Sequence, residues 1–93
     1  MSLSVMVMKK GNPSKPIYQC FDTYAIEWLQ NILCEEDPNG NYWEAQFDFS
    51  DVNLEKIKKR VTKINQEATK FLEALNQIEL EGRENFTYSG GTA

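Results

Sequence analysis

Apolar and polar residues alternate in the first segment of the chain, residues 2–8. One face of this segment carries the apolar residues Leu3, Val5 and Val7, and the other carries serines and methionines. A period of two with β-branched residues is typical of a β-strand. The segment from Lys9 to Pro16 contains glycine and two prolines, which predicts a loop. Residues 17–21 then form a second predicted strand, antiparallel to the first.

The clearest strand pattern covers Tyr42 to Phe49 and follows a strong turn signal at Asp37–Gly40. One face is apolar and consists of Trp43, Ala45, Phe47 and Phe49. The opposite face is polar and consists of Tyr42, Glu44, Gln46 and Asp48. This contrast predicts a sheet that is covered on one side and open to solvent on the other.

Helical spacing begins near Tyr24, after Asp22 or Thr23 as the capping residue. The apolar residues of this helix fall at i, i+3, i+4, i+7 and i+8, namely Ala25, Trp28, Leu29, Ile32 and Leu33. The acidic residues Glu35, Glu36 and Asp37 follow. Because a helix dipole disfavours negative charge at its C-terminal end, we expect the helix to end there.

A second helical pattern runs from Leu54 to about Leu80 without an internal Gly or Pro, and Gly82 is a plausible C-cap. Its apolar residues alternate in spacings of three and four: Leu54, Ile57, Val61, Ile64, Ala68, Phe71, Leu75 and Ile78. This heptad seam predicts one long amphipathic helix.

Together these patterns predict an α+β fold in β-β-α-β-α order. A small three-stranded sheet carries one short and one long C-terminal helix on one face. Residues 1–82 form a single domain, and Arg83–Ala93, which ends in Ser-Gly-Gly-Thr-Ala, forms a partly disordered tail. The predicted core contains Leu3, Val5, Val7, Trp28, Leu29, Ile32, Trp43, Phe47, Phe49, Ile57, Val61, Ile64 and Phe71.

The long helix is large for the body that must cover it. Helical residues 54–78 would measure ~37 Å, whereas a compact chain of this length is about 32 Å across. Within the chain, the first helix or a tail carrying Phe86 and Tyr88 could cover the excess. A second copy is the alternative, and it agrees with the charge order, because the helix is basic in its first half and acidic in its second. Antiparallel packing in a twofold dimer pairs these halves. The predicted interface is Ala68, Phe71, Leu72, Leu75 and Ile78.

Composition fits an ordinary globular chain: 93 residues, 41% hydrophobic, 26% charged and a formal net charge of −4. The acidic balance argues against direct nucleic-acid binding. The apolar run at Val5–Met8 is too short to span a membrane and has no basic leader before it, so we expect a cytoplasmic protein.

Several kinds of chemistry have no candidate residues. The chain has no histidine, which excludes His-based acid–base catalysis and His-ligated zinc. Two cysteines, Cys20 and Cys34, are too few for a zinc site alone, and we expect reduced thiols. Glu44 and Asp48 would lie ~13 Å apart along a strand, too far for paired carboxylate catalysis. We therefore predict no catalytic residue, cofactor site or metal site.

The sequence favours a non-enzymatic protein–protein interaction module, homodimeric through the long helix. The alternative is a small acidic inhibitor or nucleic-acid mimic that occupies a basic groove of a partner protein. Its binding surface would consist of Glu35, Glu36, Asp37, Glu44 and Asp48. A basic stripe on the long helix, Lys56, Lys59, Arg60 and Lys63, is interpreted as a solvated face.

Overall fold

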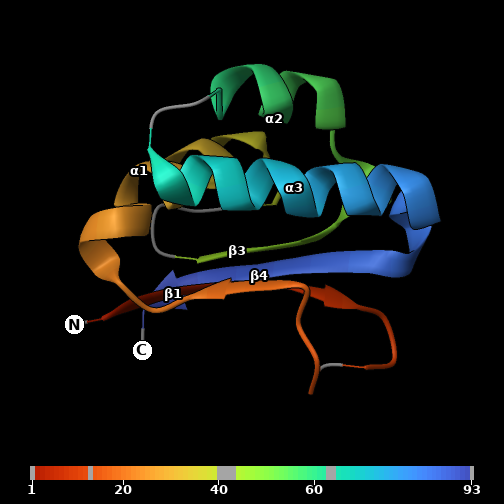
Figure 1. The fold of residues 1–93 in the computed structure, drawn as a ribbon, viewed down its shortest axis with the longest axis horizontal. Helices are drawn as coiled ribbons and strands as arrows, with labels where there is room; N and C mark the ends of the chain where they lie inside the picture. The colour runs from red at the N-terminus through yellow and green to blue at the C-terminus, as the bar shows by residue number, and fades with distance from the viewer. Residues whose placement is uncertain (1, 13, 40–43, 63–64, 93) are drawn as a thin grey trace.

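The computed structural model of the chain describes residues 2–12, 14–39, 44–62 and 65–92. Four antiparallel strands form one sheet in the order β2-β1-β4-β3. Their bounds are Leu3–Lys9 for β1, Tyr18–Cys20 for β2, Glu44–Asp48 for β3 and Phe86–Thr92 for β4. All helices of the described chain lie on one side of the sheet (Figure 1). The predicted α+β class is confirmed, although the sheet has four strands where three were expected.

The additional strand comes from the segment that was expected to be a partly disordered tail. After a short 3₁₀ turn at Arg83–Asn85, β4 enters the interior of the sheet. It pairs with β1 along its whole length and with all of β3 on its other side. The expectation of disorder was therefore wrong for residues 83–92. The alternation of buried Phe86 and Tyr88 with more exposed residues is the strand signal in this segment.

The predicted long helix is two helices, α2 at Leu54–Arg60 and α3 at Gln66–Glu81. Helix α2 ends at Val61, and the side chain of Asn65 caps α3 by accepting from the amide of Ala68 at 3.0 Å. The break lets α2 lie above α1 and α3, farther from the sheet (Figure 1). A sixteen-residue α3 is ~24 Å long. It fits within the molecule's extents of 32 × 27 × 25 Å, so the expected excess length does not arise.

Helix α1 spans Thr23–Glu36 and packs on the sheet against β1 and β3. Asp22 caps it by accepting from the amide of Tyr24, as one of the two expected caps. Its buried residues are Ile26, Leu29, Gln30 and Leu33. The predicted core positions Trp28 and Ile32 are only partly buried, because the inward face is rotated by about one residue from the predicted one.

The core lies between the sheet and the helices. Most of the predicted core is confirmed as buried: Leu3, Val5, Val7, Leu29, Phe47, Phe49, Ile57, Val61 and Phe71. Trp43 and Ile64 lie outside the described residues. The largest buried side chains that the prediction left out of the core are Tyr18, Ile26, Leu33, Leu54, Leu75, Ile78, Phe86 and Tyr88. Phe86 and Tyr88, the tail residues that were expected to cover the long helix if no second copy did, are fully buried in this core.

Candidate functional site

The predicted dimer interface on the last helix is occupied by the chain itself. Four of its five residues, Ala68, Phe71, Leu75 and Ile78, are fully buried in the core, and Leu72 is partly buried against it. The side chains on which the prediction depended are thus not available to a second copy in the folded chain. The physical basis of that interface, an uncovered apolar seam, is absent from the described structure.

The acidic corner at the end of α1 is paired with the basic residues of α2. Arg60 contacts Glu35 at 2.5 Å and Glu36 at 3.0 Å, and Lys56 contacts Glu36 at 3.5 Å. These pairs join residues that lie 20 to 25 positions apart in the chain. The basic stripe was interpreted as a solvated face, but part of it instead neutralises two of the five carboxylates of the predicted acidic surface.

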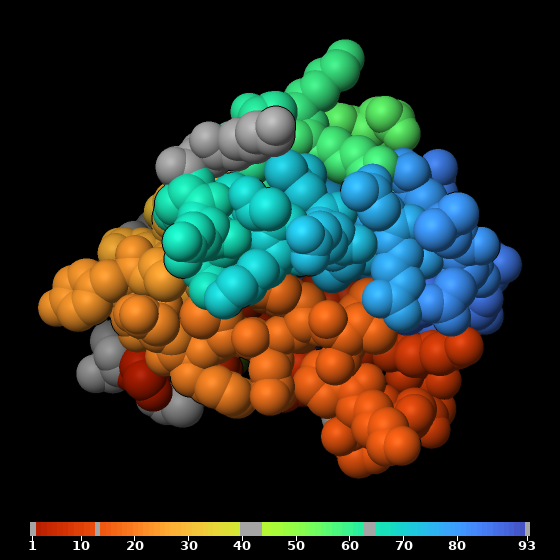
Figure 2. Space-filling model, in the orientation of Figure 1, coloured from red at the N-terminus to blue at the C-terminus, as the bar shows by residue number. Residues whose placement is uncertain are grey.

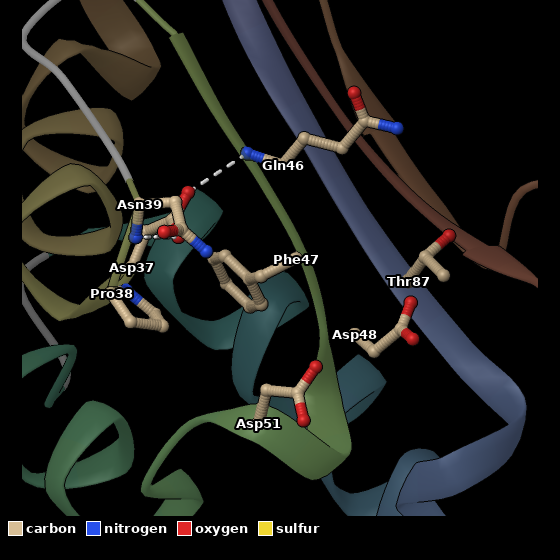
Figure 3. A pocket seen from close by; sticks show the side chains of 8 residues that line it. All are labelled: Asp37, Pro38, Asn39, Gln46, Phe47, Asp48, Asp51 and Thr87. Atoms are coloured by element: carbon tan, nitrogen blue, oxygen red, sulfur yellow. Dashed lines mark hydrogen bonds between the residues drawn. The ribbon is translucent and has the colours of Figure 1, made fainter.

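Asp37, the third of these carboxylates, is a structural group. It is 7% exposed. Its Oδ1 accepts from the amide of Asn39 at 2.9 Å, and its Oδ2 accepts from the amide of Gln46 at 3.1 Å. Figure 3 shows this carboxylate directed at the main chain of β3. Asp37 therefore satisfies an outward amide of an edge strand, which protects that edge from pairing with other chains.

Asp37 lines a surface pocket of about 370 Å³, and Asp48 and Asp51 line the same pocket (Figure 3). Asp48 pairs with Lys10 at 3.0 Å, and Glu44 is exposed farther along β3. The predicted acidic residues are therefore distributed over a helix end, a buried clamp and a strand face. They do not form one continuous surface of unpaired charge.

A buried polar pair lies between α1 and β4. The hydroxyl of Tyr88 donates to Oε1 of Gln30 at 2.5 Å, and Nε2 of Gln30 is buried without a hydrogen-bond partner. Burial also raises the pKa of Tyr88 well above its ordinary value. The pair lies over Gly90, where an added Cβ would be 2.3 Å from Oε1 of Gln30. Gly90 is thus the position at which β4 must have no side chain.

Neither Cys20 nor Cys34 forms a disulfide, and burial raises the pKa of Cys34. A raised pKa reduces the thiolate fraction and hence the reactivity of a cysteine. Within the described ranges, no group of three or more acidic or cysteine side chains is arranged to hold a metal ion. None of the described helices is both long and apolar enough to cross a bilayer.

Two exposed aromatic residues lie where β2 joins α1. Tyr24 is 94% exposed and Phe21 is 60% exposed. Trp28, one turn after Tyr24, is partly buried and donates its indole N–H to the carbonyl of Ala25 at 2.6 Å. This bond directs the indole back along the helix toward the first turn, and residues four apart are neighbours on a helix surface. We call Phe21, Tyr24 and Trp28 the aromatic corner.

The border of the aromatic corner is acidic. Asp22 lies between Phe21 and Tyr24 in the sequence, and Glu27 is exposed on the solvent side of α1. The remaining large apolar side chain that the described residues expose is Leu80 in the last turn of α3, 88% exposed. Figure 1 shows the end of α3 on the opposite side of the view from the start of α1. Two of the three large hydrophobic side chains that the described residues expose, Phe21 and Tyr24, therefore lie three positions apart at the start of α1.

Sequence reasoning did not find the aromatic corner. Phe21 was assigned to a strand, Tyr24 to the start of a helix and Trp28 to the core. The available signal was that Tyr24 falls outside the apolar stripe of its helix, which predicts exposure. Comparisons of the chain with protein-family models, curated proteins and solved structures give no match.

Proposed function

We propose that the chain is a non-enzymatic protein-binding module that contacts its partner through the aromatic corner. The observation that carries the proposal is the exposure of Tyr24 and Phe21, whereas the other aromatic residues that the structure describes are buried or partly buried. Tyr and Trp are the residues most enriched among those that dominate binding energy at protein interfaces. The absence of histidine from the chain agrees with a role in binding.

The size of the corner limits what it can do alone. If each ring offers ~200 Å², Tyr24 and Phe21 together expose roughly 300 Å². A stable interface buries about 800 Å² on each partner. The corner is thus large enough to be the centre of an interface, while its acidic border, Asp22 and Glu27, must supply part of the surrounding contact.

The chemistry of the border indicates the kind of partner. Two carboxylates beside exposed aromatic rings suit an apolar surface that carries Arg or Lys, because a cation can pair with the acid and lie over a ring. The predicted alternative is an acidic inhibitor or nucleic-acid mimic, and it has less support. Its surface was expected to consist of Glu35, Glu36, Asp37, Glu44 and Asp48. The first three of these carboxylates are held by Arg60, Lys56 and main-chain amides of the same chain, and Asp48 pairs with Lys10.

Photo-crosslinking tests the proposal. A benzophenone amino acid is placed at Tyr24 in the full chain, in the host cell, and a matched chain carries it at Leu80, which is equally exposed but distant. We expect a discrete crosslinked protein from position 24 and none from position 80. The purified partner should then bind Tyr24→Ala at least about thirtyfold more weakly than wild type, the loss expected for a hot spot.

A control variant and a contrary result complete the design. Leu80→Ala should leave the affinity unchanged, and Glu27→Lys should weaken binding more at low salt than at high salt. Equal crosslinking at both positions, or equal effects of Tyr24→Ala and Leu80→Ala on affinity, would contradict the proposal.

A further inference from the structure

Among the described residues, no strand pairs with the outer edge of β2, the first strand in the order of the sheet. Val7 accepts from the amide of Ile17 at 2.9 Å, and the amide of Leu3 donates to Thr23 at 2.9 Å, so the odd-numbered residues of β1 face β2. The even-numbered side faces β4, as the bond from Lys10 to Asn85 shows. In an antiparallel pair the main-chain groups of successive residues point to opposite sides.

This alternation fixes the direction of the central residue of β2. Tyr18 and Cys20 are opposite Val7 and Val5 and point their main-chain groups at β1. The amide and carbonyl of Gln19 must then point to the free edge of the sheet. No side chain in the described ranges bonds to them, whereas Asp37 bonds to the corresponding outward amide of Gln46 on β3. One edge of the sheet is closed by the chain and the other is open.

Helix α3 presents a polar flank on the same side of the molecule. The flank consists of Glu67, Lys70, Glu73, Ala74 and Gln77, and with Ile17, Tyr18 and Gln19 it lines a groove of about 370 Å³. In Figure 2, α3 and the segment around β2 face the viewer together. The other flank of α3 contacts α2, where Lys58 bonds to Glu79 at 2.7 Å and to Asn76 at 3.2 Å.

We infer that this groove is a docking surface for a second copy of the chain, related by a twofold axis beside Gln19. The two β2 strands would pair antiparallel, each Gln19 exchanging both main-chain bonds with its counterpart, and the two sheets would become one sheet of eight strands. The two α3 helices would then run antiparallel, flank to flank. The dimer thus uses α3, but not the buried seam that the sequence predicted.

The charges on the flank are complementary to themselves under this symmetry. An axis passing between residues 71 and 72 places Lys70 opposite Glu73 of the second copy, and Glu73 opposite its Lys70. Phe71 lies beside this axis on α3, and its ring contacts that of Tyr18, the neighbour of Gln19 on β2, with centroids 5.4 Å apart. Parallel packing of the helices would place like charges opposite one another and is disfavoured.

The proposed dimer interface is small, and its area determines how tightly the two copies should bind. From Glu67 to Gln77 the flank is ~15 Å long, so the patch is well below the roughly 800 Å² per partner of a stable interface. The dimer should therefore be weak, with a dissociation constant between about 10 µM and 1 mM. It should also weaken with added salt, because its helix contacts are exposed ion pairs.

A charge swap tests the inference. Sedimentation equilibrium of the full chain is measured up to about 1 mM. Lys70→Glu and Glu73→Lys should each weaken the dimer at least about tenfold, because each places like charges across the axis. The double variant Lys70→Glu with Glu73→Lys restores opposite charges and should restore dimerisation. Lys59→Glu on α2 makes the same charge change as Lys70→Glu away from the groove and should have no effect.

A second variant tests the strand pairing. Gln19→Pro removes an amide that β1 does not use, so the fold should persist, as monitored by circular dichroism, while the dimer is lost. A chain that is monomeric at about 1 mM would overturn the inference. So would a dimer that neither single charge reversal weakens, or one that the double variant fails to restore. If an extended peptide but not a second copy shifts the amide resonance of Gln19, the edge accepts a different occupant and the inference is likewise wrong.

Discussion

Replacing Gly90 with alanine should destabilise the fold far more than the same change at its neighbour Gly91. An added Cβ at Gly90 would be 2.3 Å from Oε1 of Gln30, 2.5 Å from the hydroxyl of Tyr88 and 2.9 Å from its Cζ. Neither group can move away easily, because Gln30 is 3% exposed and Tyr88 is fully buried in the core. The hydrogen bond between the two side chains must therefore break or the strand must shift.

The expected magnitude follows from these contacts. Overpacking a core costs about 1–3 kcal/mol, and a buried polar group that loses its partner costs a further ~1–3 kcal/mol. Alanine regains about 0.4–1 kcal/mol by restricting the unfolded chain. We expect Gly90→Ala to lower the free energy of unfolding by about 2–5 kcal/mol. Gly91 lies on the open face opposite Ser4, and its substitution should change that free energy by no more than about 0.5 kcal/mol.

Urea denaturation followed by circular dichroism measures both variants and a double-mutant cycle. In a background of Gln30→Ala with Tyr88→Phe, the two closest contacts of the new methyl group are absent. The cost of Gly90→Ala should then fall by at least about 1 kcal/mol. Equal costs for Gly90→Ala and Gly91→Ala, or no reduction in the double-variant background, would refute the reasoning.

Two further predictions concern other buried groups. Asp37→Asn keeps the size of the side chain but leaves one oxygen to accept from the two amides of Asn39 and Gln46, with an NH₂ group facing the other amide. It should therefore lower the free energy of unfolding, measured by urea denaturation, by about 1–3 kcal/mol. An unchanged midpoint would contradict the role of Asp37 in holding Gln46. A hydrogen bond from the hydroxyl of Tyr18, 2.8 Å away, lowers the pKa of Glu67 below its ordinary 4.5. Its contribution to stability is therefore present above that value and is lost as the pH falls through the lowered pKa. The stability difference between wild type and Tyr18→Phe should be larger at neutral pH than near pH 3, and a difference independent of pH would contradict the link.

The strand faces were predictable because they depend on local alternation. Val5, Val7 and Phe47 are buried where the period of two placed them. The last strand was missed because Ser89, Gly90 and Gly91 have the composition of a linker. Gly90 is glycine for a reason that lies in another element, the position of Gln30 on α1. No local pattern carries that information.

The acidic surface failed for a related reason. Charges that are close in sequence, Glu35, Glu36 and Asp37, gave the appearance of a concentrated negative patch. Arg60 comes to Glu35 from 25 residues away, and this pairing depends on where α2 folds. The aromatic corner was missed because alternation and helical spacing predict which residues can face inward. These two patterns do not show which of those residues are buried in the folded core.

The broken helix shows how a correct pattern can lead to a wrong length. The spacing of three and four continues from Leu54 to Ile78, and all of the described residues in that series are buried. Continuity of the seam was taken as continuity of the helix. In the structure two helices bury the apolar residues of this series. Helix α2 buries Leu54 and Ile57 and packs against α1 and α3, and α3 buries Phe71 and Leu75 in the core above the sheet. The mismatch between helix length and body size was a sound observation. A break capped by Asn65, whose side chain favours a helix start over a helix interior, is the solution that the same residues permit within one chain.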